Sequence, residues 1–200
     1  LQRPSPPPMT AEKALAALKD GNNRFCENIA QHPHEDPTWR HSLAGGQEPF
    51  AAVLACADSR LTPEIIFDQG LGDLFVIRVA GNVARSKVLG SLEYAVAQLN
   101  VPLIVVLGHE SCGAVQASFA GGTPPGHLGA IVEAIKPAVY MARLEEGDQL
   151  AAAVRYNARL TAEHIKEAEP ILAPAVQENR LRVVPSFYHL SSGRVDCFEA

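Results

Sequence analysis

One stretch, Cys56-Ala57-Asp58-Ser59-Arg60, limits what this chain can fold into more than any other. It follows the apolar run 51–55, which has the composition of a short strand buried on both faces, and it precedes Thr62-Pro63, a pair typical of a helix start. A thiol, a carboxylate and a guanidinium therefore leave the end of a buried strand together. Because burying such groups is costly unless they are paired or bind a ligand, this strand end is a candidate functional site.

A second stretch has the same design. The apolar run 101–108 ends in His109-Glu110-Ser111-Cys112-Gly113. In an open parallel sheet, ligands bind beyond the carboxyl ends of the strands, where the strand order reverses. If the two strands are neighbours, Cys56, His109 and Cys112 converge on one point. We expect His109 and Cys112 to share a face of the first turn of a helix, whose N-terminus favours a thiolate.

Two thiolates and one imidazole are three of the four ligands that a tetrahedral Zn²⁺ takes. The fourth position is left for water, which is typical of a catalytic rather than a structural zinc site. Taken singly, Cys56 has an ordinary interpretation as a buried strand-end thiol, and His109 as a core histidine. Joined at this spacing with Cys112, they predict a site for one Zn²⁺ per subunit.

The two motifs, in this order and each closing an apolar strand, resemble the paired signatures of the β-class carbonic anhydrases, Cys-x-Asp-Ser-Arg and His-x-x-Cys. The resemblance extends to the segments 78–82 and 184–193 and covers roughly residues 11–198. It implies a zinc lyase (a carbonate dehydratase) that reversibly hydrates CO₂ to bicarbonate and a proton by attack of a zinc-bound hydroxide. It also implies a homodimer or a dimer of dimers, with the zinc sites near the dimer seam.

Asp58 and Arg60 fit this chemistry as a pair. An ionised carboxylate can only accept hydrogen bonds, so Asp58 can hold the O–H of the hydroxide and aim its oxygen at CO₂. Arg60 can pair with Asp58 through two bonds, which fixes the carboxylate and keeps it from becoming the fourth zinc ligand. Outside this motif, the same residues would be interpreted as a capping carboxylate and a structural ion pair.

The resemblance also implies a substrate pocket. It places Gln47, Phe75 and Tyr94 along the pocket wall, and Gly113 where a backbone N–H faces the substrate. Phe75 also fits a core position, and Tyr94 lies off the apolar stripe of its helix, which equally suits a subunit interface. Either Gln47 or Tyr94 could act on the partner's site. Val53 stands where members with a self-closing, bicarbonate-regulated site commonly carry Trp, so we expect the open, plant-type site.

The predicted fold class is α/β, with a central, mostly parallel sheet of four to five strands flanked by helices and an N-terminal helical arm. We expect a Pro-rich arm over residues 1–9 and a single domain over residues 10–200. Strand 74–79 is apolar enough to be covered on both faces, and Pro185 indicates an edge or a bulge. The predicted helices are 10–28 (capped by Thr10), 63–68, 86–99 (capped by Ser86), 128–144, 148–167 and 171–178; the predicted strands are 51–55, 74–79, 101–108, 182–187 and 195–198; residues 32–47 and 121–126 are predicted loops.

Composition excludes several other classes. The formal net charge is -5 with no Lys/Arg block, which argues against nucleic acid as a partner. The chain contains no apolar run of the roughly 18 residues that a membrane span needs. Its four cysteines include no Cys-x-x-Cys, so a redox dithiol protein is disfavoured. We expect Cys26 and Cys197 to be buried or half-buried thiols, and a bridge between them stays open.

Two other functions stay open. One is a zinc hydrolase for a CO₂-like heterocumulene such as carbon disulfide, which would differ in its access route rather than in its ligands. The other is a non-catalytic module that binds zinc or bicarbonate, and the presence of both Asp58 and Arg60 disfavours it. No signal-peptide pattern is visible, so we expect a cytoplasmic protein. The alternative is an exported, periplasmic protein whose removed leader is not present in this chain.

Overall fold

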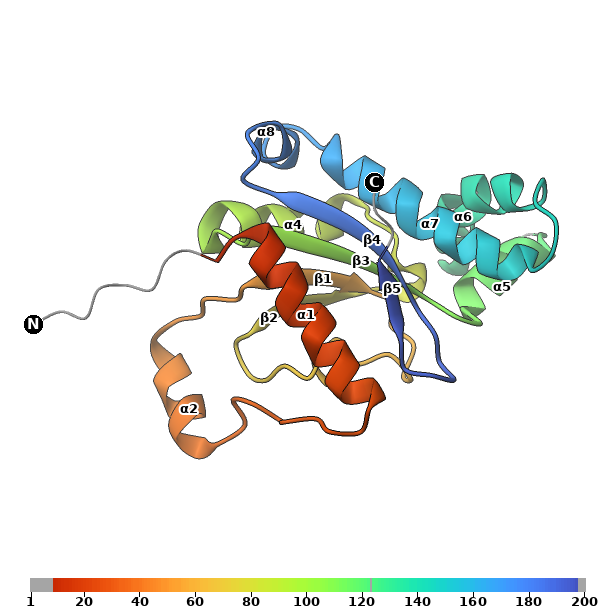
Figure 1. Cartoon of the computed structure of the whole chain (residues 1–200). Helices are drawn as coiled ribbons and strands as arrows, with labels where there is room; N and C mark the ends of the chain where they lie inside the picture. Colours follow the sequence, from red (N-terminus) through yellow and green to blue (C-terminus); the bar gives the residue numbers. More distant parts are fainter. Residues whose placement is uncertain (1–8, 123, 198–200) are drawn as a thin grey trace, which may run out of the picture.

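The computed structural model describes residues 9–122 and 124–197 and has the predicted α/β fold, a five-stranded sheet between layers of helices (Figure 1). The strands are β1 (Ala51–Ala55), β2 (Leu74–Arg78), β3 (Leu103–His109), β4 (Arg182–Tyr188) and β5 (Val195–Cys197). Their order is β2-β1-β3-β4-β5; β1, β2, β3 and β4 run parallel, and β5 pairs antiparallel to β4. Apart from Met9, the predicted Pro-rich arm lies outside the described residues.

The strand order creates a switch point between β1 and β3. From β1 the chain crosses to β2 on one side, whereas from β3 it crosses to β4 on the other. The register pairs Ala55 of β1 with Leu107 of β3, so that the residues following both strands meet at the same edge. This edge, beyond the carboxyl ends of the strands, is where ligands collect in open α/β sheets.

Both faces of the central strands are buried because their residues alternate between two apolar layers. Val53 of β1 and Val105 of β3 belong to the layer that includes Leu15 and Leu18 of α1, the helix that crosses the front of the sheet in Figure 1. Their sequence neighbours in each strand belong to a second layer, which α4, α7 and α8 supply. Alternation with a period of two on a doubly covered sheet explains why β1 and β3 are almost entirely apolar.

The helices are α1 (Ala11–Cys26), α2 (Pro37–Ser42), α3 (Pro63–Ile66), α4 (Ser86–Leu99), α5 (Gly113–Ala120), α6 (Leu128–Ala142), α7 (Gln149–Lys166) and α8 (Leu172–Gln177), with 3₁₀ turns η1 (Leu43–Gly45) and η2 (Ala80–Asn82). Thr10 caps α1 as predicted, since its side chain accepts a hydrogen bond from the Lys13 N–H at 3.3 Å. Of the described residues, none belongs to a helix that combines the length and the apolar character needed to cross a membrane.

The prediction of a continuous loop over 32–47 is wrong, because α2 and η1 lie within it. The Asp36 carboxylate accepts hydrogen bonds from the Thr38 and Trp39 N–H groups, both at 2.9 Å, and Pro37 occupies the first turn. Asp and Pro, the residue types at positions 36 and 37, are favoured in turns as well as at helix starts, so the sequence pattern does not distinguish a loop from a short helix here. Ser86 was also misplaced: it is the first residue of α4, and Arg85 is the N-cap, without a side-chain hydrogen bond.

Two strands were predicted to have distinctive environments. β2 is an edge strand whose apolar side chains pack against both apolar layers, but they are half-buried rather than fully covered and remain partly accessible in this single chain. β4 lies between β3 and β5, but β5 pairs only with Ser186–Tyr188. At Pro185, β4 therefore pairs with β3 alone and has an open edge on its other side, as the proline indicates.

Candidate active site

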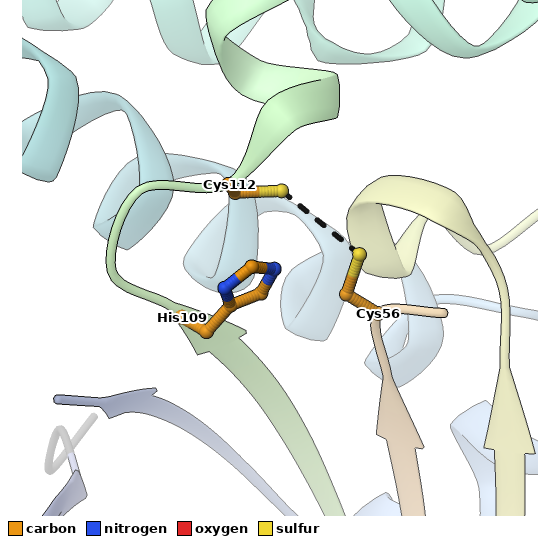
Figure 2. A group of neighbouring side chains, drawn as sticks. All are labelled: Cys56, His109 and Cys112. Atoms are coloured by element: carbon orange, nitrogen blue, oxygen red, sulfur yellow. Dashed lines mark hydrogen bonds between the residues drawn. The ribbon is translucent and has the colours of Figure 1, made fainter. Parts of the chain in front are cut away.

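The three predicted ligands meet at the switch point. Cys56 follows β1, His109 ends β3, and Cys112 is the N-cap residue of α5; Figure 2 shows their side chains pointing toward one another. Their ligand atoms all lie within 4.8 Å of one another, and the two sulfurs are 4.0 Å apart. All three residues are buried.

One detail of the prediction was wrong: His109 is on the strand, so the two residues do not share a helical face. The turn between them is made by Ser111, whose φ of 53° is left-handed. This backbone conformation, and not a helical period, brings the imidazole back toward Cys112.

His109 is oriented so that one ring nitrogen faces the sulfurs. Its Nδ1 lies 2.9 Å from the Glu110 carbonyl oxygen, and because a carbonyl can only accept, Nδ1 carries the proton. The other nitrogen, Nε2, is then an acceptor; it is fully buried and has no hydrogen-bond partner. A buried nitrogen lone pair that has no hydrogen-bond partner and lies next to two thiols is typical of a metal ligand.

The two thiols share a hydrogen bond and titrate as a pair. The hydrogen bond from Cys112 is the largest cause that lowers the pKa of the Cys56 thiol, to about 4, and the backbone N–H groups of Gly81 and Asp58 act in the same direction. The same bond, together with burial, raises the pKa of Cys112. The pair therefore loses its first proton easily and holds the second, which a divalent cation would have to displace.

This donor set fits Zn²⁺. Tetrahedral zinc with bonds of about 2.3 Å to sulfur would place two thiolates about 3.8 Å apart, close to the observed 4.0 Å. The unpartnered Nε2 of His109 supplies the third donor. Three protein ligands leave one coordination position for water or substrate.

Asp58 and Arg60 form the predicted two-bond pair beside this cluster. Arg60 Nε donates to Asp58 Oδ1 at 2.9 Å, and Arg60 Nη2 donates to Oδ2 at 2.7 Å. The side-chain hydrogen bond from Arg60 is the main cause that lowers the pKa of Asp58, which therefore stays ionised. Asp58 Oδ2 is 3.9 Å from His109 Nε2, so the carboxylate faces the cluster without entering it.

Two residues without a predicted role also support the strand end. Arg78, the last residue of β2, donates from Nε to the Cys56 carbonyl oxygen at 3.1 Å and from Nη2 to the Asp58 carbonyl oxygen at 2.5 Å. Because Arg78 ends the strand next to β1, its position in the sequence could have indicated a role beside Cys56. Asn157 on α7 donates to the Gly81 carbonyl oxygen at 2.8 Å, and Gly81 in turn donates to the Cys56 sulfur at 3.3 Å. Asn157 is a polar residue in the otherwise mostly apolar buried stripe of α7, and this interruption could have indicated its role from the sequence.

Of the predicted pocket residues, the structure places Gly113 beside the cluster and the other three elsewhere. Gly113 is the first residue of α5, directly after Cys112. Gln47 precedes the amino end of β1, and Phe75 pairs with Ala52 in the sheet, about 13 Å of strand away from Cys56. The ring of Tyr94 on α4 is 6.2 Å from that of Phe75 and is 49% exposed. Within one chain these three residues do not line the Cys-His-Cys site.

Glu110 is half-buried: its Oε2 accepts the Leu190 N–H at 2.9 Å and ties the loop after β3 to the loop after β4. The expectation for Cys26 was wrong, because its thiol is exposed, whereas Cys197 is half-buried as expected; both are free thiols. The question of a bridge between Cys26 and Cys197 is thereby answered in this structure.

Comparisons with known proteins agree with this site. Residues 51–195 match the family model for carbonic anhydrase. The chain is 46% identical over 192 residues to carbonic anhydrase 2 of Mycobacterium tuberculosis, covering 90% of this chain and 89% of that protein. It is 43% identical to the carbonic anhydrase of Mycolicibacterium smegmatis, with 92% and 91% covered. A tetrameric β-carbonic anhydrase from Sordaria macrospora superimposes with a TM-score of 0.76 at 26% identity, covering 94% of this chain and 96% of that one.

Proposed function

The chain belongs to the β-class carbonic anhydrases, enzymes that hydrate CO₂, and from this premise we propose that it is a zinc enzyme whose Asp58-Arg60 pair orients the attack on CO₂. The observation that carries the proposal is the buried cluster of Cys56, His109 and Cys112, with an unpartnered imidazole nitrogen facing two sulfurs. These three residues would hold the Zn²⁺. When bound, zinc supplies the Lewis acidity that makes hydroxide available from water near neutral pH.

Asp58 orients the nucleophile. Its carboxylate is ionised and can only accept, so it takes a hydrogen bond from the O–H of the attacking hydroxide and leaves an oxygen lone pair free for the carbon of CO₂. Arg60 holds both carboxylate oxygens, and its backbone N–H adds a third bond to Oδ1 at 3.0 Å. This restraint keeps Asp58 from turning onto the metal, which supports the open, plant-type form of the site.

Gly113 offers a backbone N–H at the N-terminus of α5, adjacent to Cys112. The N–H groups of a first helical turn lack partners within the helix and carry partial positive charge, so they stabilise an anionic product such as bicarbonate. Water then displaces bicarbonate, and a proton leaves to solvent before the next turnover.

We propose that the active form is a homodimer or a dimer of dimers. The half-exposed edge strand β2 and the exposed ring of Tyr94 leave an apolar surface that a second copy would cover. In that assembly Gln47, Phe75 and Tyr94 would contribute to the partner's pocket, which explains why they lie away from the cluster of their own chain. The tetrameric relative from Sordaria macrospora supports this assembly.

The first experiment is stopped-flow CO₂ hydration across roughly pH 6.5 to 9.5, on protein whose zinc content is determined in parallel. We expect rapid hydration that rises with pH, disappears when a chelator removes the metal, and returns when zinc is added. Zinc-loaded protein that hydrates no CO₂ would contradict the proposal. Hydrolysis of carbon disulfide by that protein would then assign the heterocumulene hydrolase, and bicarbonate binding without turnover would assign the binding module.

A further inference from the structure

A chain of two buried hydrogen bonds connects Cys56 with a helix that supplies no ligand. Asn157 of α7 donates from Nδ2 to the Gly81 carbonyl oxygen at 2.8 Å, and the Gly81 N–H donates to the Cys56 sulfur at 3.3 Å. Asn157 is only 3% exposed, and Gly81 is buried. The contact therefore links the sulfur to α7 through the backbone of Gly81.

Gly81 adopts a backbone conformation that needs support. Its φ is 73°, in the left-handed region, and a Cβ at this position would lie 2.7 Å from Ile135 Cδ1. Glycine is therefore required here, but glycine also leaves the backbone free to take up other conformations. The Asn157 amide fixes the carbonyl side of Gly81, and this in turn limits the direction in which its N–H can point.

Apolar packing alone already holds α7 in place. Val154 of α7 contacts Gly108 of β3, where a Cβ would lie 2.9 Å from Val154 Cγ1. Ala158 and Ile165 of the same helix are fully buried in the second apolar layer. Asn157 interrupts this stripe with a side chain that is costly to bury unless it is hydrogen-bonded. The amide of Asn157 therefore gives Gly81 a directed contact that the apolar residues of α7 cannot supply.

We propose that Asn157 is a positioning residue that directs the Gly81 N–H at the Cys56 sulfur and thereby tunes this sulfur as a metal ligand. The inference rests on the proposed zinc site. A hydrogen bond to a thiolate stabilises its lone pairs and fixes its direction, as partners of first-shell ligands generally do in metal sites. The role is distinct from that of Asp58 and Arg60, because Asn157 acts through backbone and does not face the substrate.

The test compares Asn157→Leu with Thr161→Val in the full chain. Leucine has the same branched shape and the same number of side-chain heavy atoms as asparagine, although its methyl groups are bulkier, and it cannot donate to Gly81. Thr161 lies one turn further along α7, is 8% exposed, and is not part of the Gly81 contact, so its variant is the matched control for losing a buried polar group from this helix. For each protein we would measure zinc affinity by chelator competition, the thiolate-to-cobalt absorption band of the cobalt form, and unfolding by denaturant.

For Asn157→Leu we expect zinc to bind about tenfold more weakly and the cobalt band to move to lower energy, because the Gly81 N–H is no longer held toward the sulfur. Thr161→Val should leave both unchanged. If Asn157→Leu loses stability but keeps the affinity and the band of the control, Asn157 is merely structural and the inference is wrong. If leucine prevents folding, Asn157→Ser, whose hydroxyl is too short to reach Gly81, is judged by the same two criteria. An unmodified protein that binds no zinc would instead refute the metal site itself.

Discussion

The two ends of the sheet differ in how complete they are. Beyond the carboxyl ends of β1 and β3, the groups with metal-binding chemistry are buried and lie within 4.8 Å of one another in a single chain. Toward the amino ends, Gln47, Phe75 and Tyr94 are half-buried or exposed, and they do not reach that cluster. One chain thus brings the candidate metal ligands together, whereas a pocket wall made from these residues would need the second copy that we propose.

The largest effect is expected at the carboxyl end. Cys56→Ser removes one of three ligands, so we expect zinc affinity to fall by more than the roughly 10- to 100-fold typical of losing a supporting contact, with hydration lost in parallel. Zinc content after gel filtration, together with stopped-flow hydration, measures both. Cys26→Ser, at an exposed thiol, is the matched control and should behave like the unmodified protein. A fully metallated, active Cys56→Ser protein would remove Cys56 from the ligand set.

The next effect separates chemistry from metal binding at the same end. Asp58→Ala should keep zinc and lower the hydration rate by about 10²- to 10³-fold, because the nucleophile loses the group that orients it. Arg60 is half-exposed and stays solvated when its partner is removed, so no loss of folding is expected. Unchanged turnover at full zinc occupancy would exclude Asp58 from the mechanism.

A mixing experiment tests whether the amino end of one chain serves the site of another. Gln47→Ala and Cys56→Ser proteins should each be weakly active or inactive, because a homodimer of either variant contains no intact site. After they are unfolded and refolded together, half of the dimers are mixed, and each mixed dimer holds one intact site. We therefore expect recovery of about a quarter of the sites of the unmodified protein. No recovery, with mixed dimers shown to be present, would mean that Gln47 acts within its own chain or not at all.

The smallest effect on activity is expected at a second Arg-Asp pair. Arg24 Nε donates to Asp68 Oδ2 at 2.6 Å, and Asp68 also accepts the Gln31 and His32 N–H groups, so no acceptor is left for chemistry. Arg24→Ala should lower the free energy of unfolding by about 1–3 kcal/mol and leave hydration per zinc unchanged. Denaturant unfolding and stopped-flow hydration measure the two. A matching fall in hydration per zinc would show that this pair is not purely structural.

The same pair gives a pH prediction. Burial raises the pKa of Asp68, but the hydrogen bonds from Gln31, Arg24 and His32 outweigh it, so the pKa is lowered on folding. A carboxylate with a lowered pKa contributes stability above its ordinary pKa of about 4, and this contribution is lost as the pH falls toward the folded value. The stability difference between Arg24→Ala and the unmodified protein should therefore narrow in acid. A difference that widens below pH 4 would contradict this assignment.

The carboxyl end could be predicted from the sequence because its information is local. Apolar runs locate β1 and β3, and the residues that follow each run must emerge at the same edge of a parallel sheet. The turn at Ser111 could not be predicted, since a left-handed serine leaves no sequence signature. The contact of Asn157 with Gly81 could not be predicted either, because it depends on how α7 lies on the sheet. The edge position of β2 depends on strand order, which residue composition does not encode.

The switch point between β1 and β3 also sets the order of events when the protein is made. Cys56 belongs to one half of the cluster and His109 and Cys112 to the other, and more than one helical crossover separates them along the chain. The three side chains meet only after β1 and β3 have paired, and pairings between distant parallel strands form late and slowly. The three side chains therefore cannot form a metal site in a chain whose sheet has not yet assembled. A metal ion held by all three of them would bind after β1 and β3 have paired.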